Sequence, residues 1–470
     1  MLYPTMSPPM LQRTWKGKHP DEVVAQRAAN LPGIVTLPVR NLDPTLRKVM
    51  WALDKRWGAT DLDAVREKTR TRLQGMNLDK ISAGETVNLL ANPHGFSLCG
   101  DAYVAMLEET QKYVVDKTRG RVRLRIAESM GHIENPDWVK IFDLDDRFGP
   151  VKEIPQIDRG VEIDTRIGKF WLCRPLFAAD HFIHTHVTEM REGYLHRMVD
   201  RLHKPFGMGY TRIETRSAYH FGYGPRTGQI VSRAVFDSDY VQSKYVGTVV
   251  LDTTPEGVVD VDADNDLDAL NQRLTIEVLR TYGPLMRLLG EIEDVVVVFD
   301  GHGCFLYSYA AGLPFDALLY AAVDFLDLDN LALLSAFTSK LPTNPGLFLR
   351  SNPAIKAIVV NYMPGGVPFT STVRNIPTFL VDGPAAEWLI TDPSNAQLAE
   401  YVSLITDLPA AMARAKQAAG TDNVIVYDSL PGAFHLSEGL ANRMMERAPG
   451  VVSDVHHRLL PKWLAQRSFR

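Results

Sequence analysis

The sequence predicts an α/β protein of two domains, each built on a mainly parallel sheet, and three observations lead to this prediction. The chain has 470 residues, which is more than a single hydrophobic core usually serves. Short apolar runs with strand character alternate with longer segments of helical periodicity. The alternation continues on both sides of an acidic stretch near residue 265, so we assign residues 1–270 to one domain and residues 271–470 to the other.

The elements of the first domain follow from the spacing of its apolar residues. The first 45 residues contain many prolines and are expected to lie on the surface. Within the acidic stretch Asp260–Asp268, the segment Asp260–Asp266 is predicted to be a solvated loop. Strands are expected at Thr86–Ala91, Val122–Ile126, Phe170–Cys173, His181–Val187 and Val246–Leu251, and helices at Leu46–Asp54, Leu62–Leu73 and Tyr103–Asp116.

The second domain shows the same alternation. Strands are expected at Val295–Asp300, Ala357–Val360, Thr378–Val381 and Val424–Tyr427, and helices at Leu274–Leu289, Pro314–Leu326 and Leu408–Ala419. In α/β folds of this kind, ligands bind where the carboxyl ends of the strands meet, often between domains. We therefore expect the active site in an interdomain cleft.

Composition excludes several classes of function. Hydrophobic residues are 45% and charged residues 23%, which rules out a mainly disordered chain. The net charge of −5 gives no basic surface for general nucleic-acid binding. The three cysteines lie too far apart for a zinc site, an iron–sulfur ligand set or a disulfide framework. Because the sequence shows no signal peptide and no apolar run of membrane-spanning length, we expect a cytoplasmic protein without a membrane partner.

Histidines gather in one part of the chain. Of 13 histidines, six lie within residues 181–220, where about one would be expected if they were spread evenly. The six are His181, His184, His186, His196, His203 and His220. Because imidazole titrates near neutral pH and binds transition metals, this excess favours a metal site or an acid–base site. The alternative is that several of them are ordinary helix-surface residues.

Two further motifs lie near this cluster in the sequence. Gly131-His132 follows the expected strand Val122–Ile126, and α/β enzymes keep catalytic groups at such strand ends. Lys204 precedes a glycine-containing turn, which suits an anion site or a covalent attachment point. Each motif alone is weak, since loop histidines and lysines before turns are common.

Taken in order, these motifs resemble the nickel-pincer lactate racemase family and its homologues. Lys204 and His220 are 16 positions apart, which is the family's spacing between its lysine and its histidine as we align it. The resemblance spans roughly residues 85–435. It is carried by the strands TVNLLA and RVRLRIA, Gly131-His132, Ala179-Asp180-His181-Phe182-Ile183, Gly312-Leu313-Pro314-Phe315-Asp316 with Tyr320, and Val424–Asp428 followed by Leu430-Pro431-Gly432.

The resemblance implies a cofactor and a reaction. In this family a pyridinium nucleotide with two sulfur groups is tethered to a lysine and holds nickel through carbon and sulfur, and a histidine completes the metal. Here Lys204 would be the tether and His220 the nickel ligand. The implied reaction is racemisation or epimerisation of a 2-hydroxy acid, with His132 as one proton acceptor. Cofactor synthesis in the family needs accessory enzymes, which are therefore implied partners.

The chain departs from the family at several positions. The loop after the first strand carries Asn92 and His94 where the family has an arginine that helps to hold the cofactor. Arg191 aligns with the family's second base, so His196 or His186 is an alternative for that role.

Substrate recognition also differs from the family. Tyr320 matches a tyrosine of the family, but Asp324 replaces the lysine that holds the substrate carboxylate. Because Asp324 would repel a carboxylate, we expect a sugar acid, such as an aldonate or a uronate, rather than lactate. In this hypothesis Asp324 contacts hydroxyl groups of the substrate, and Arg191 contacts its carboxylate.

Two other interpretations remain open. His184 and His186 lie two residues apart on an expected strand, so both imidazoles could bind one ion, as in metal-dependent hydrolases. The chain could instead be a homologue that binds a ligand without turnover, because the family's loop arginine and substrate lysine are missing.

Overall fold

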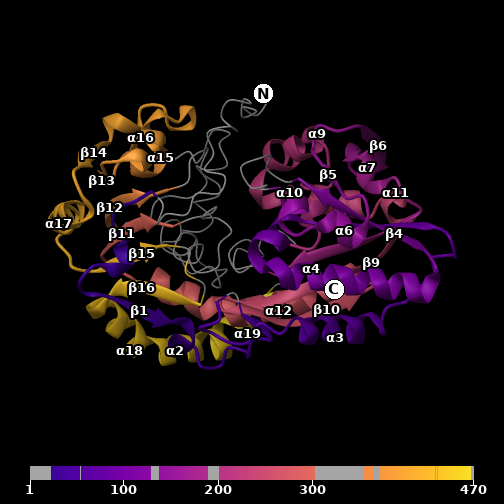
Figure 1. The fold of residues 1–470 in the computed structure, drawn as a ribbon, viewed down its shortest axis with the longest axis horizontal. Coiled ribbons are helices and arrows are strands. Elements are labelled where there is room, and N and C mark those ends of the chain that lie inside the picture. The colour runs from indigo at the N-terminus through magenta and orange to yellow at the C-terminus, as the bar shows by residue number, and fades with distance from the viewer. Residues whose placement is uncertain are drawn as a thin grey trace. The chain divides into compact units, whose positions relative to one another are not determined.

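A computed structural model describes residues 23–52, 54–128, 137–188, 201–301, 354–363, 370–428, 430 and 432–466. The chain divides into two compact units (Figure 1). The first unit is Arg47–Val278, and the second combines residues 23–46 with the described residues after Leu279. Each unit contains a seven-stranded, mainly parallel sheet with helices, which confirms the predicted fold class. The division falls within helix α12 (Leu267–Gly290).

The sheet of the first unit has the strand order β2-β10-β9-β8-β3-β4-β5. The five strands from β9 to β5 run parallel, and β10 is antiparallel to β9. The strands are β2 (Trp51–Ala52), β3 (Thr86–Ala91), β4 (Arg121–Ala127), β5 (Lys152–Ile154), β8 (His181–Val187), β9 (Tyr245–Thr254) and β10 (Gly257–Asp264). A separate hairpin pairs β6 (Gly160–Thr165) with β7 (Gly168–Cys173).

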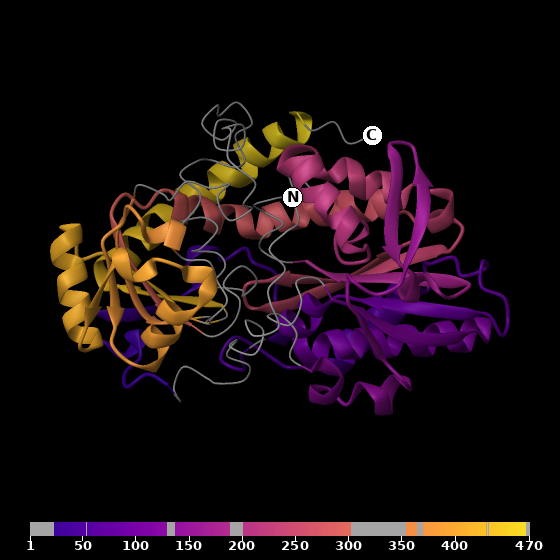
Figure 2. The same cartoon turned by 90° about the horizontal axis from the view of Figure 1, so that it is seen from above.

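Helices cover both faces of this sheet (Figure 2). Helix α4 (Pro93–Thr118) contacts the face to which Thr185 belongs, and the segments around α10 (Gly224–Phe236) contact the other face. The remaining elements are α3 (Leu62–Leu73), α5 (Trp138–Ile141), α6 (Leu144–Phe148), α7 (Arg174–Phe177), η3 (Lys204–Phe206), α9 (Ile213–Ser217), η4 (Ala218–Gly222) and α11 (Asp239–Gln242). Because both faces are covered, the central strands β3, β8 and β9 are almost wholly buried.

The second unit is built on a sheet of order β1-β16-β15-β11-β12-β13-β14. The strands from β15 to β14 run parallel, and β16 is antiparallel to both of its neighbours. Its strands are β1 (Ile34–Pro38), β11 (Val295–Asp300), β12 (Ile355–Tyr362), β13 (Thr378–Val381), β14 (Val402–Ile405), β15 (Val424–Tyr427) and β16 (Ala433–Ser437).

Helix α17 (Leu408–Ala419) packs its apolar side on β11, β12 and β15, with Ala411 and Ala415 fully buried. Asp407 caps the helix by accepting the backbone N–H of Ala410, and Gly420 ends it in a left-handed conformation. The other elements are η2 (Ala28–Asn30), α2 (Val39–Leu42), α15 (Thr370–Val373), α16 (Pro384–Thr391), η7 (Pro393–Asn395), η8 (Leu398–Glu400), α18 (Glu438–Asp454), η9 (Val455–Leu459) and α19 (Leu460–Gln466).

Two of the predicted elements are wrong. Leu46–Asp54 was expected to be a helix, but Trp51 and Ala52 form strand β2, because they pair with the start of β10. The segment Asp260–Asp266 was expected to be a loop, yet residues 260–264 belong to β10 and pair with β9. The expected helix Pro314–Leu326 lies outside the described residues.

None of the described helices combines the length and the apolar character that crossing a membrane requires.

Gly95 offers a test of the packing within α4, where the first turn lies against Tyr103 beyond the kink at Gly100. A Cβ added at Gly95 would lie 2.3 Å from the buried ring of Tyr103, whereas a Cβ at Gly209 meets nothing within 4 Å. Alanine normally favours a helix over glycine by about 1 kcal/mol, but this overlap reverses the sign. We expect Gly95→Ala to lower the free energy of unfolding by about 1–3 kcal/mol in urea titrations. Gly209→Ala is the control and should change stability little; equal effects of the two substitutions would contradict the packing described.

Candidate functional site

Buried polar side chains collect where the parallel strands of the first unit end. Asn92 follows β3, Glu128 follows β4 and Thr188 follows β8, and all three are buried. Asp252, near the end of β9, is buried beside them in the sheet, because Leu251 pairs with Val187. Burial of a polar group is costly without a partner, and ligands of α/β folds bind at the carboxyl ends of the strands. We therefore take this polar edge as the candidate site.

The turn from β3 into α4 is organised by Asn92. Its Oδ1 accepts the backbone N–H of His94 at 2.9 Å, and its own N–H donates to the Tyr103 hydroxyl at 3.2 Å. Pro93 at the first helical position supports this N-terminus, since proline needs no hydrogen bond there. Gly95 lies against the Tyr103 ring. The predicted cofactor residues Asn92 and His94 are therefore both buried at the start of a helix, where backbone N–H groups favour anions.

Strand β8 presents different groups on its two faces. Thr185 accepts or donates a 2.7 Å hydrogen bond with Tyr103 of α4 and donates to the Leu90 carbonyl at 2.8 Å. On the opposite face, the Nδ1 of His184 lies 2.5 Å from the hydroxyl of Tyr210. The imidazole of His184 is completely buried, and its pKa lies well below the usual range because burial disfavours the charged form and His186 is nearby. His184 is therefore neutral at pH 7.

Lys204 begins the short turn η3 (Lys204–Phe206) and is half-buried. The Lys204 loop, defined here as residues 204–210, is closed by backbone hydrogen bonds: Pro205 O accepts Tyr210 N–H at 2.8 Å, and Lys204 O accepts Gly207 N–H at 2.9 Å. Phe206, two residues after Lys204, packs edge-on to the His184 ring with centroids 5.6 Å apart. The Lys204 loop thus lies directly on β8.

His220 belongs to the π-helical turn η4 (Ala218–Gly222), and the structure does not describe its side chain. Its neighbour Tyr219 belongs to the same buried cluster as Phe206 and Tyr210. A Cβ on Gly207 would come within 2.8 Å of the Tyr219 ring, so the Lys204 loop and η4 are in close contact. The two segments with the predicted tether and nickel ligand are therefore neighbours.

Five predicted site residues lie outside the described part of the chain. They are His132, Arg191, His196, Tyr320 and Asp324. His132 comes five positions after the last residue of β4, and Arg191 four positions after the last residue of β8. Both strands end at the polar edge described above.

His184 and His186, the metal-binding pair of the hydrolase interpretation, lie on the same face of β8, because residues two positions apart on a strand point to the same side. The rings of His184 and His186 are 5.7 Å apart and both are buried. However, Nδ1 of His184 is occupied by Tyr210. Within the described residues, no group of three or more histidine, cysteine, aspartate or glutamate side chains is arranged to hold a metal ion. This part of the chain therefore gives the hydrolase interpretation no support.

Asp252 lies on β9, at one side of the polar edge. It accepts a hydrogen bond from the Thr188 hydroxyl at 3.0 Å and forms an ion pair with Arg47. The Thr253 hydroxyl donates to the Thr188 carbonyl at 2.7 Å, which fixes the ends of β8 and β9 together. Burial raises the pKa of Asp252 to about 6, and the hydrogen bonds and the charge of Arg47 oppose that rise.

The second unit has comparable groups at the carboxyl edge of its own sheet. Asp300 ends β11 and accepts hydrogen bonds from Arg27 Nε at 3.1 Å, Ala28 N–H at 2.6 Å and Asn361 Nδ2 at 2.7 Å. Burial raises its pKa to about 6. On the next strand, Asp428 contacts Nδ1 of His435.

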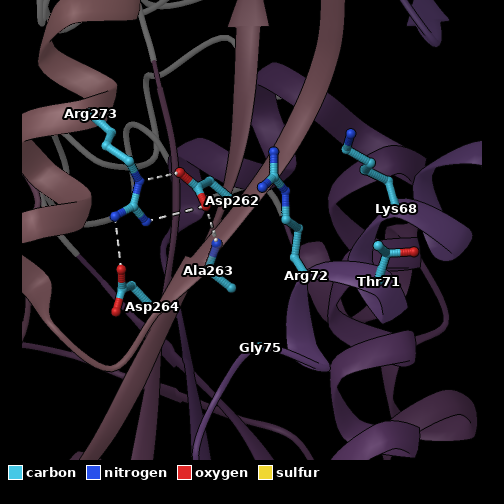
Figure 3. A pocket seen from close by; sticks show the side chains of 8 residues that line it. All are labelled: Lys68, Thr71, Arg72, Gly75, Asp262, Ala263, Asp264 and Arg273. Carbon is cyan, nitrogen blue, oxygen red and sulfur yellow. Dashed lines mark hydrogen bonds and ion pairs between the residues drawn. The ribbon is translucent and has the colours of Figure 1, made fainter.

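A cavity of about 420 Å³ lies elsewhere in the first unit (Figure 3). It is bordered by α3, β10 and α12, and charged side chains dominate its lining. Arg273 pairs with Asp262 at 3.0 Å and with Asp264 at 2.8 Å, while Arg72 donates to the Val261 carbonyl. None of the predicted site residues lines it, and its charges neutralise one another, so we do not assign the candidate site to this cavity.

Tyr103, Tyr210 and Asp252 were not predicted from the sequence. Each acts through a partner on a distant segment, as Tyr210 does with His184 at 26 positions and Asp252 with Thr188 at 64 positions. The one local signal is that Tyr210 ends the glycine-containing turn after Lys204.

Comparisons with known proteins add nothing to this geometry. No protein-family model matches the sequence, and no curated protein matches it.

The raised pKa of Asp252 predicts a pH effect on stability. A carboxyl group with a pKa of about 6 in the folded chain, against about 4 when unfolded, holds its proton more tightly in the folded state. Its contribution to stability is therefore complete below pH 4 and is lost as the pH rises through 6. We expect wild type to lose about 2 kcal/mol relative to Asp252→Asn between pH 4 and pH 7, measured by urea unfolding at each pH. A difference that stays constant or grows with pH would contradict this.

Proposed function

We propose that this chain is a racemase or epimerase of 2-hydroxy acids that works with a nickel-pincer nucleotide tethered to Lys204. The observation that carries the proposal is the close contact between the Lys204 loop and η4, the turn that contains His220. In the resembled family these two residues hold the same cofactor. The Lys204 loop also lies on β8, whose end belongs to the polar edge.

The described residues fit an anionic nucleotide. The N-terminus of α4, with Asn92 as its cap, presents backbone N–H groups that suit a phosphate. Lys204 is half-buried, so its side chain combines a sheltered stem with some access. The family's metal is held mostly by the nucleotide itself and needs one protein histidine. The lack of a three-residue metal cluster in the described residues is therefore compatible with the proposal.

When bound, the nickel-pincer nucleotide would accept a hydride reversibly, which no side chain can do. The remaining tasks belong to the chain. His132 takes the hydroxyl proton of the substrate, because imidazole has a suitable pKa for that step at neutral pH. Inversion needs a second acid–base group on the opposite face, for which His196 and His186 are the candidates.

Recognition of the substrate rests on three further residues. Arg191 is proposed to hold the substrate carboxylate, with a bidentate geometry that arginine favours. Tyr320 and Asp324 are proposed to contact hydroxyl groups, so that a sugar acid is preferred over lactate. Enzymes that build the cofactor are the implied partners, and the few, widely spaced cysteines support a cytoplasmic location.

The attachment of the cofactor can be tested by intact mass. We expect wild-type protein isolated from its native host to carry an adduct of nucleotide mass together with nickel. The adduct should be lost in Lys204→Ala, because no amine remains at that position, and kept in Lys169→Ala, which changes a lysine on the separate hairpin. A wild-type chain without an adduct and without epimerase activity on any 2-hydroxy acid would favour the non-catalytic interpretation instead.

The roles of two histidines can be separated by their variants. His132→Ala should lower epimerase activity at least about a hundredfold without unfolding the chain, because a general base is lost. His220→Ala should lower the nickel content measured by mass spectrometry, because a metal ligand is lost. Full activity of His132→Ala, or full nickel content of His220→Ala, would exclude the corresponding role.

A further inference from the structure

The buried imidazole of His184 has one nitrogen without a hydrogen-bond partner among the described residues. Its Nδ1 contacts the Tyr210 hydroxyl, whereas Nε2 is buried and makes no hydrogen bond within the described part of the chain. An unpaired polar group in a protein interior is costly, and native chains rarely keep one without a function or an absent partner. Nε2 of His184 is therefore a candidate contact for a bound molecule.

The contacts of Tyr210 indicate which nitrogen of His184 carries the proton. The hydroxyl lies 2.5 Å from Nδ1 of His184 and 3.4 Å from the Leu90 carbonyl. The Leu90 carbonyl already accepts the Thr185 hydroxyl at 2.8 Å. These distances favour donation from the Tyr210 hydroxyl to Nδ1, so the proton of the neutral imidazole lies on Nε2. His184 then offers a buried N–H donor that needs an acceptor.

The surroundings of His184 indicate which molecule it would meet. Phe206, two residues after Lys204, packs on the imidazole, and Tyr210 ends the same loop. The loop that carries Lys204 therefore packs on His184. Such a buried donor favours an anionic acceptor, because hydrogen bonds to charged groups are the stronger ones.

We propose that Nε2–H of His184 donates a hydrogen bond to the acidic substituent, a carboxylate or thiocarboxylate, of the pyridinium nucleotide held by Lys204. This inference rests on the proposed function for the identity of the nucleotide. Tyr210 is a positioning residue in it, because its hydroxyl fixes the tautomer of His184 and ties the Lys204 loop to β8. His184 itself is a binding residue and takes no part in proton transfer.

Binding of two pyridinium mononucleotides to the full chain tests the inference. Nicotinic acid mononucleotide has a carboxylate on the ring, and nicotinamide mononucleotide has an amide at the same place. By calorimetry we expect wild type to prefer the acid, and His184→Leu to bind the acid about ten- to a hundredfold more weakly while binding the amide nearly unchanged. His184→Gln, which keeps an N–H donor, should retain part of the preference.

Stability measurements separate a binding role from a structural one. His184→Leu alone would leave the buried hydroxyl of Tyr210 without its partner, so the stability comparison uses the double variant His184→Leu with Tyr210→Phe, whose unfolding midpoint should be unchanged or higher because both polar partners are removed together. Unchanged preference for the acid in His184→Leu would overturn the inference, whatever its stability. A lowered unfolding midpoint of the double variant, together with affinities for both nucleotides equal to those of wild type, would also overturn it. His184 would then be structural or bound to a water molecule.

Nuclear magnetic resonance of 15N-histidine-labelled chain tests the tautomer directly. Wild type should show His184 protonated on Nε2, and Tyr210→Phe should shift the population toward Nδ1 and weaken binding of the acid. A proton on Nδ1 in wild type would overturn the inference. Wild type that binds neither mononucleotide would also overturn it, whereas the proposed function fails separately, through the absence of a Lys204 adduct in protein from the native host.

Discussion

The hydroxyl of Tyr210 holds the candidate site together. It is bonded to His184 on β8 and lies 3.4 Å from the Leu90 carbonyl on β3, so the end of the Lys204 loop is attached to β8 and packs beside β3. The Tyr210 backbone also closes the loop, because its N–H donates to Pro205 and its carbonyl accepts the N–H of Cys173. Leu90 lies two residues before Asn92, so the same hydroxyl sets the position of Lys204 relative to the start of α4. Any ligand held by both segments depends on this attachment.

Much of the fold could be predicted because its central strands are continuous apolar runs between turn residues. Thr86–Ala91, His181–Val187 and Val295–Asp300 were predicted with the bounds that the structure shows. Such runs are typical of parallel strands covered on both faces. Strand β10 was missed for a physical reason, since its aspartates alternate with apolar residues and suggest a solvated loop. Lys68 and Arg72 of α3 and Arg273 of α12 neutralise them, and no local pattern reveals partners that distant.

The site was predictable only in part. The excess of histidines between residues 181 and 220 predicted a site on β8 and the segment that follows it, and this stays a prediction. The structure adds that His184, His186 and His203 are all buried, which makes them components of the core as well as candidates for chemistry. Tyr210 could not be found from the sequence, because its role depends on Leu90, which is 120 positions away and contributes only a backbone carbonyl. Periodicity identifies strands, but it does not identify which carbonyl a distant hydroxyl will meet.

Buried carboxylates with raised pKa values would ordinarily be considered as catalytic bases, but the partners of Asp252 and Asp300 argue against that role. Asp252 is bound by Thr188 and Arg47, and Asp300 by Arg27, Asn361 and a backbone N–H. A base must present an open lone pair to its substrate, and these oxygens are already engaged. Both arginines come from the N-terminal 47 residues, so this segment neutralises charges at the ends of β9 and β11. The raised pKa values therefore report burial within the fold.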